Sequence, residues 1–187
     1  MKSRCVVIGM FLVGVTLSPI GAMGGGSGES GRDRAAAAVA SFAGELQQAL
    51  TGAMSSFGPL AAIEVCNVKA PAIAARVSEQ SGVRVSRTSE RTRNARNAAS
   101  GWQAEVLRAW AAEIAAGADP KALEHFEEIA DGGFRYMKPI MVQPICLTCH
   151  GASPQPEIEM ALGDLYPGDR ATGYSAGDLR GAFVAQN

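Results

Sequence analysis

Residues 60–88 read LAAIEVCNVKAPAIAARVSEQSGVRVSRT, and the hydrophobic period changes within this stretch. Its first part has apolar residues three and four apart, at Ile63, Cys66, Ala70, Ile73 and Val77. This spacing predicts one face of a helix from Leu60 to about Gln80, kinked at Pro71. Val83–Thr88 is β-branched and alternating, which predicts a strand. The chain therefore passes from helix to strand within thirty residues.

Further elements are expected on both sides of this stretch. They are a helix over Arg34–Phe57 with Asp33 as N-cap and Gly58-Pro59 as its end, a helix from Ser100 or Gly101, a short helix from Pro120 to about Asp131, a strand over Phe134–Val142 with an edge or bulge at Pro139, a helical turn over Glu157–Leu162, and a last strand at Phe183-Val184. Helices followed by a few strands predict an α+β fold, and not a four-helix cytochrome.

The N-terminus has the pattern of a secretory signal peptide. Lys2 and Arg4 precede an uncharged apolar run, and small residues follow it. We expect a signal peptide over residues 1–23, a flexible Gly/Ser-rich linker over 24–34 and one domain over 35–187. The predicted location is periplasmic or otherwise exported, without stable membrane insertion after cleavage. An uncleaved anchor is the alternative, although the apolar run is short for a span.

Composition limits the classes of partner. The chain has 187 residues and a net charge of −1, so no overall field draws it to nucleic acid or to a membrane. About 150 residues would remain after processing, enough for one domain with a core. We found no internal repeat.

The segment Cys146-Leu147-Thr148-Cys149-His150 carries the clearest chemical signal. C-x-x-C-H is the attachment signature of a c-type haem. The two thiols add to the haem vinyl groups, and the adjacent histidine can reach the iron as proximal ligand. A bare C-x-x-C would also fit a disulfide or half a zinc site. We therefore predict one covalent haem c, held by Cys146 and Cys149, with His150 on the iron.

Cys66 is the odd cysteine of the predicted mature chain. Its place in a helical stripe is compatible with a buried core thiol. It is also a candidate for the second axial position on the iron, where it would bind as thiolate. The rivals for that position are Met137, Met141, Met160 and His125. Met137 and Met141 share side-chain parity on an expected strand near the motif, whereas His125 lies among acids and is expected on a solvated helix.

Five arginines lie within the expected strand Val83–Thr88 or shortly after it, at Arg84, Arg87, Arg91, Arg93 and Arg96. A solvated basic face is one interpretation, and few aromatics interleave to suggest nucleic acid. A haem carries two propionates, and arginine is suited to bidentate carboxylate pairing. Arg84, Arg87 and Arg93 are the candidate propionate contacts.

Taken together, these motifs resemble a known family, the bacterial c-type haem-binding domains of PAS-like fold. The resemblance is carried by Cys66 with residues 70–74, by 83–89 with Arg93, Asn94, Asn97 and Trp102, by 146–151, by 166–169 with Ala171, Gly173 and Tyr174, and by 177–178 with 180–182. The domain that defines this family was long catalogued as a domain of unknown function. The same domain also occurs as the extracytoplasmic sensor of some histidine kinases. The chain departs from the pattern at Ala95, Ala98 and Gln103.

The resemblance implies a small antiparallel sheet with long N-terminal helices in a single domain. It also implies a histidine and cysteine axial pair, here His150 and Cys66. We expect a redox or small-ligand sensor with an unidentified redox or signalling partner, or alternatively a periplasmic electron-transfer cytochrome. A haem enzyme is not expected, because a six-coordinate iron has no open site. Tyr166, Asp169, Tyr174 and Asp178 stay unassigned, because turn formation explains them adequately and only the resemblance implies a role in covering the haem.

Overall fold

The computed structural model describes residues 29–187, so the expected signal peptide over 1–23 lies outside the described residues. Helix α1 (Gly31–Glu64) begins earlier than expected and takes in residues 31–34 of the expected linker. Ser30 is its N-cap in place of Asp33, because the Ser30 hydroxyl accepts the backbone N–H of Asp33 at 3.1 Å.

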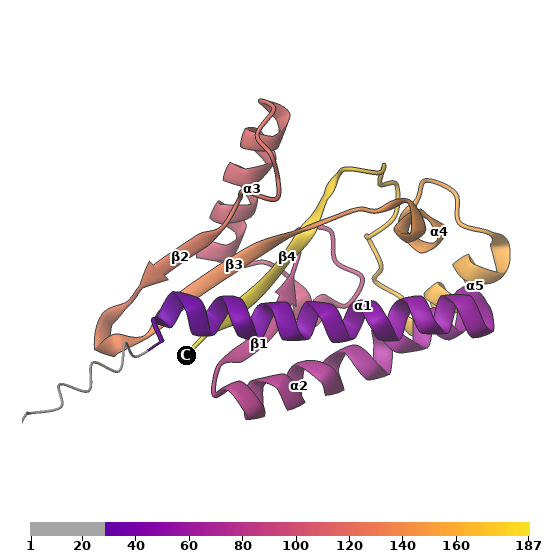
Figure 1. The fold of residues 1–187 in the computed structure, drawn as a ribbon. Coiled ribbons are helices and arrows are strands. Elements are labelled where there is room, and N and C mark those ends of the chain that lie inside the picture. The colour runs from indigo at the N-terminus through magenta and orange to yellow at the C-terminus, as the bar shows by residue number, and fades with distance from the viewer. Residues whose placement is uncertain (1–28) are drawn as a thin grey trace, which may run out of the picture.

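Helices, short helical turns and four strands follow α1 along the chain (Figure 1). They are η1 (Val65–Lys69), α2 (Ala70–Ser81), β1 (Arg84–Thr88), η2 (Ala95–Asn97), α3 (Trp102–Ala115), β2 (His125–Glu128), η3 (Ala130–Gly132), β3 (Phe134–Met141), η4 (Pro144–Cys146), α4 (Leu147–His150), α5 (Pro156–Leu165) and β4 (Leu179–Gln186).

The strands form an antiparallel sheet in the order β1-β4-β3-β2. This confirms the predicted α+β fold with a small antiparallel sheet and a long N-terminal helix. Strand β2 pairs with β3 only as far as Met137, so Pro139 lies where β3 has a single partner, as its missing N–H favours. The β3–β4 register shifts between Ile140 and Met141.

Helices cover both faces of the sheet (Figure 1). Helices α1 and α2 bury one core against it, including Phe42, Val77, Val85 and Phe134. Helix α3 covers the other face, where Leu107 and Trp110 pack with three buried residues of the sheet. By length and composition alone, the helical run Gly31–Ser81 could cross a membrane.

The helical run is interrupted twice. Gly58, with φ 79°, bends α1 without ending it, so the expected stop at Gly58-Pro59 is a kink. Residues Val65–Lys69 form a π-turn that ends two residues before Pro71. Proline in a regular helix would clash with the carbonyl four residues earlier. The wider turn, in which the N–H of Ala70 reaches the carbonyl of Val65, accommodates the ring.

Two further sequence-based expectations were wrong. The helix expected from Pro120 to Asp131 is a turn followed by β2, because residues 125–128 pair with β3 and tertiary pairing overrides their helical propensity. The haem motif was expected in a loop, but it lies on the helical turns η4 and α4. The expected helical turn after it is the ten-residue helix α5.

Candidate functional site

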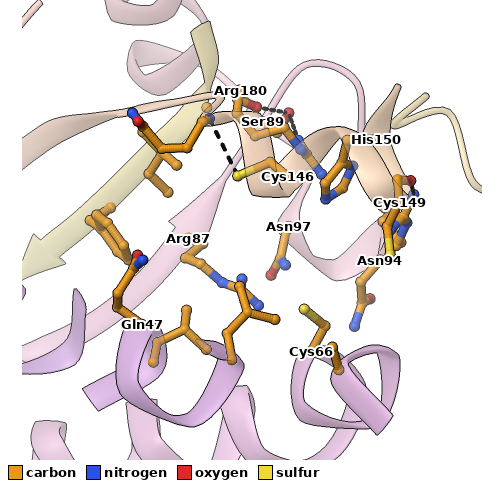
Figure 2. A pocket seen from close by; sticks show the side chains of 18 of the residues that line it. Gln47, Cys66, Arg87, Ser89, Asn94, Asn97, Cys146, Cys149, His150 and Arg180 are labelled. Atoms are coloured by element: carbon orange, nitrogen blue, oxygen red, sulfur yellow. Dashed lines mark hydrogen bonds between the residues drawn. The ribbon is translucent and has the colours of Figure 1, made fainter. Parts of the chain in front are cut away.

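A cavity lies between the helix layer, the sheet and the segment that carries the cysteine motif. Its lining includes Cys66, Arg87, Arg93, Cys146, Cys149 and His150, which are six of the seven residues predicted for the site. Figure 2 shows Cys66 on the helix side and His150 and Cys146 across the cavity from it. The structure thus gathers residues that are up to 84 positions apart (150 − 66).

Local structure explains how the motif presents its side chains. Cys146, Cys149 and His150 are three and four residues apart on consecutive helical turns, so they share one side. The N–H of Gln143 donates to Cys146 Sγ at 3.4 Å. Helix α4 ends at Gly151, where a Cβ would meet the Leu147 carbonyl oxygen at 2.6 Å. A glycine is therefore required to close this turn.

His150 is held in the form that binds a metal. Its Nδ1 lies 2.6 Å from the carbonyl oxygen of Ala171, and since a carbonyl only accepts, Nδ1 carries the proton. This leaves the lone pair on Nε2, the atom free to ligate. Burial lowers the pKa of His150 to about 3, helped by the positive charges of Arg93 and Arg180. The imidazole is therefore neutral at physiological pH.

The support of His150 continues through Asp169, which sequence reasoning left unassigned. Asp169 Oδ1 accepts the N–H of Ala171 at 2.7 Å, and Oδ2 accepts Arg93 Nε at 2.9 Å. The Arg93 guanidinium also donates to the carbonyl of Cys149 at 2.6 Å. Arg93 and Asp169 are 9% and 12% exposed. Arg93 is thus a partner of the motif's own backbone, a role the sequence did not indicate.

Cys66 is half-buried and lies within the π-turn η1. Such turns recur at functional sites, because the bulge redirects side chains. All three described cysteines are free. Burial raises the pKa of the Cys149 thiol. The cavity lining and Figure 2 place the Cys66 thiol on the same cavity as the two thiols of the motif, on the opposite side from them.

Three of the four rivals to Cys66 lie away from the cavity. Met137 is fully buried under α3, Met160 is 66% exposed on α5, and His125 stacks on Trp102 at 5.7 Å between ring centroids. His125 is on a strand, so its expected helical position was wrong. Met141 does line the cavity, because the bulge between Ile140 and Met141 breaks the parity it was expected to share with Met137.

Two of the predicted arginines, Arg84 and Arg87, lie on β1, and only one of them faces the cavity. Arg87 lines the cavity, whereas Arg84 is exposed and outside it, because odd and even steps along β1 face opposite sides of the sheet. Arg180 was missed as a site residue. It lines the cavity from β4 and donates to Ser89 Oγ at 2.8 Å. Within residues 29–187, neither Arg87 nor Arg180 forms a salt bridge with a carboxylate.

Tyr166 and Tyr174 were also missed. Tyr166 lines the cavity, and Tyr174 meets the His150 ring edge-on at 6.2 Å. The guanidinium groups of Arg91 and Arg180 lie over the Tyr174 ring at 4.1 and 5.4 Å. Their positions in a turn-rich tail gave no sign of this, apart from the family resemblance.

The residues that could donate to a metal suit an ion that is already held by a cofactor, and not an ion held by protein side chains alone. In the described part of the chain, no group of three or more His, Cys, Asp or Glu side chains is placed to hold a metal ion. The neutral imidazole of His150 and the thiol of Cys66 instead approach the cavity from opposite sides. That arrangement fits the two axial positions of a porphyrin iron.

Comparisons with known proteins are consistent with this geometry. The model of the Tll0287-like family matches residues 27–186. A solved structure, the crystal structure of the cyanobacterial heme-protein Tll0287, has 23% sequence identity and a TM-score of 0.61. The alignment covers 81% of this chain and 93% of that one. No curated protein matches. At this identity the structural likeness establishes the fold.

Proposed function

The chain belongs to the Tll0287-like family, and we propose that its cavity holds one haem c, attached through Cys146 and Cys149 with His150 as the proximal iron ligand. The family assignment confirms the resemblance to haem-binding domains drawn from the sequence motifs. The observation that carries the proposal is the proton on Nδ1 of His150, which is donated to Ala171 and leaves Nε2 free on a ring that lines the same cavity as the two thiols. A metal-binding histidine commonly donates its other nitrogen in this way.

The cavity also suits the rest of the group. Arg87 and Arg180 are two cations without a carboxylate partner in the described residues, and a haem has two propionates. We propose these two arginines as the propionate contacts. Arg93 keeps Asp169 as its partner, and Arg84 lies outside the cavity.

We propose Cys66 as the second axial ligand. It lines the cavity from the helix side, and its π-turn gives it a local geometry unlike the rest of the helix. Met141 and Met54 are the methionines that also line the cavity. When bound, the haem supplies one-electron redox chemistry and a site for small diatomic ligands. A thiolate at Cys66 would favour the ferric state and a low reduction potential.

The physiological role that we propose is redox or small-ligand sensing in the periplasm, through a separate protein partner. The support is the direct connection between His150 and the sheet. The backbone N–H of Tyr174 donates to the carbonyl of His150 at 2.9 Å, and residues after Tyr174 lead directly into β4. A displacement of His150 would therefore pull on β4, one of the two inner strands of the sheet.

The attachment is tested with the full chain expressed together with a c-type haem maturation system. The doubly substituted Cys146→Ala/Cys149→Ala protein should lose all haem that resists acid-acetone extraction. Cys66→Ala is the matched control, because it removes a thiol from the same cavity and should retain covalent haem. Extraction-resistant haem in the double variant would contradict the proposal.

The axial role of Cys66 has its own readout. Electron paramagnetic resonance of the ferric protein should show a low-spin thiolate signature that Cys66→Ala loses and Met141→Leu keeps. A histidine/methionine signature that Met141→Leu loses and Cys66→Ala keeps would assign the position to Met141. Carbon monoxide that displaces an axial ligand from the reduced protein would support sensing, whereas fast electron transfer without ligand binding would support a carrier.

A further inference from the structure

We infer that Asp169 is a positioning residue that fixes the orientation of the His150 imidazole without touching it. The inference rests on the proposed role of His150 as an iron ligand. Asp169 Oδ1 accepts the N–H of Ala171 at 2.7 Å, and the carbonyl of the same residue accepts His150 Nδ1–H at 2.6 Å. The carboxylate thus holds the peptide segment on which the ring orientation depends.

The second oxygen of Asp169 reaches the motif from its other side. Oδ2 accepts Arg93 Nε at 2.9 Å, and the Arg93 guanidinium donates to the carbonyl of Cys149 at 2.6 Å. One carboxylate therefore controls both the acceptor of the His150 ring and the backbone that directly precedes it. No other carboxylate within residues 29–187 contacts either arm of this network.

The network is shielded enough to be stiff. Ala171 is fully buried, and the side chains of Arg93 and Asp169 are only 9% and 12% exposed. Hydrogen bonds to charged groups are shorter and stronger than neutral ones, and low local dielectric strengthens them further. The backbone also closes around the site, since Gly173 and Tyr174 donate to the carbonyls of Gly151 and His150 at 2.8 and 2.9 Å. A ring held in this way has one orientation available to it.

Loss of the Asp169 carboxylate should act on the reduction potential of the iron in two ways, and both should raise it. The Ala171 carbonyl becomes free to move, so His150 becomes a weaker donor to the iron. Arg93 also loses its counter-charge and becomes an unpaired cation near the cavity. A weaker donor and an added positive charge both disfavour ferric iron. The reduction potential should therefore rise, and the imidazole should occupy more than one orientation.

The experiment compares Asp169→Asn with Asp178→Asn in the haem-loaded full chain. Asp178 is the matched control, because its Oδ2 also accepts a backbone N–H in this tail, that of Ser175 at 2.7 Å, whereas only Asp169 bonds to Ala171 and Arg93. We expect Asp169→Asn to keep covalent haem, to shift the potential upward, and to split the single low-spin resonance into several. Asp178→Asn should match the wild type in all three measurements.

Unchanged resonance and potential in Asp169→Asn would overturn the inference. If that variant does not fold, Arg93→Lys replaces it, since lysine keeps the charge but cannot hold Asp169 and the Cys149 carbonyl with the same fork. An upward shift there supports the inference, and wild-type values overturn it. Failure of the proposed function itself would be distinct, because the wild-type protein would then carry no covalent haem.

Discussion

The two sides of the cavity are held in place by different forces. The helix wall, formed by the lining residues of α1 and η1, has Cys66 next to Val65, which is 1% exposed, in a helix layer anchored by Phe42. The loop wall, formed by residues 143–151 and 166–174, depends on hydrogen bonds and on the ion pair between Arg93 and Asp169. Apolar packing dominates in the helix wall, whereas the loop wall adds directional polar contacts to a small apolar cluster that includes Ala171 and Tyr174.

The difference suits what each side is proposed to do. Burial of apolar surface is strong but non-directional, so it fixes where a helix lies more than how one side chain is turned. Hydrogen bonds are individually weaker and strongly dependent on angle. The helix wall should therefore determine the stability of the fold, and the loop wall should determine the orientation of His150.

The largest effect is expected on the helix side. Phe42 is 1% exposed and meets the Phe183 ring edge-on at 5.5 Å. Phe42→Ala should lower the free energy of unfolding by about 3–5 kcal/mol, because it removes apolar contacts and leaves a cavity. Urea unfolding of the purified protein measures this.

Phe57→Ala is the control, since Phe57 lies on the same helix but is 80% exposed. Its effect should stay within about 0.5 kcal/mol. Equal losses in the two variants would mean that packing against α1 does not anchor the helix wall.

The next largest effect on stability is expected from an ion pair in the loop wall, and an ion pair between the helices serves for comparison. Arg93→Ala leaves the Asp169 carboxylate nearly buried without its partner and should cost roughly 3 kcal/mol. Arg76→Ala removes the exposed pair with Glu45 that joins α2 to α1, and it should not change stability measurably. Chemical denaturation measures both. A larger loss for Arg76→Ala would reverse the assignment of polar contacts to the loop wall.

The smallest effect concerns a hydroxyl beneath the helix layer. Burial, with the charge of Glu124 as a second cause, raises the pKa of Tyr136 well above its ordinary value. The folded protein therefore keeps this proton at a pH where the unfolded chain releases it, so stability falls as the pH rises above about 10. The loss should be about 0.8 kcal/mol half a pH unit above that value.

Tyr136→Phe should flatten this alkaline dependence, although it also loses the hydrogen bond to Glu124 at 3.1 Å. Thermal unfolding between pH 8 and 10.5 compares the two slopes. The slope of the variant should not reach zero, because burial also raises the pKa of Tyr166. Identical slopes would show that Tyr136 ionises equally in the folded and unfolded states.

Local patterns in the sequence predicted α2 and β1, which appear where expected. The alternation of Val83–Thr88 depends on neighbours within one strand, whereas the stripe from Ile63 to Val77 crosses α1, η1 and α2 and is interrupted by the π-turn. The cysteine motif was also recognisable, since its chemistry is set by five consecutive residues. The strand β2 was not, because pairing with β3 outweighs its own helical propensity.

The loop wall was beyond local reasoning. Arg93 and Asp169 are 76 residues apart, and neither has a sequence neighbour that indicates the pairing. Arg180 enters the cavity only because β4 lies next to β1 in the sheet. Long-range polar contacts of this kind depend on the topology, which periodicity does not reveal. The assignment of Cys66 likewise came from family resemblance, not from its helical stripe.

The π-turn at Val65–Lys69 also makes the position of Cys66 depend on the number of residues in this segment. A π-turn accommodates one more residue between hydrogen-bonded groups than an α-turn, so in evolutionary terms it is equivalent to a single insertion. Deleting the exposed Val68 would restore a regular helix and rotate the segments on either side by about 100° relative to each other. Cys66 would then lose its angular relation to the buried Val77. Point substitutions can spare this side of the cavity, whereas a one-residue deletion cannot.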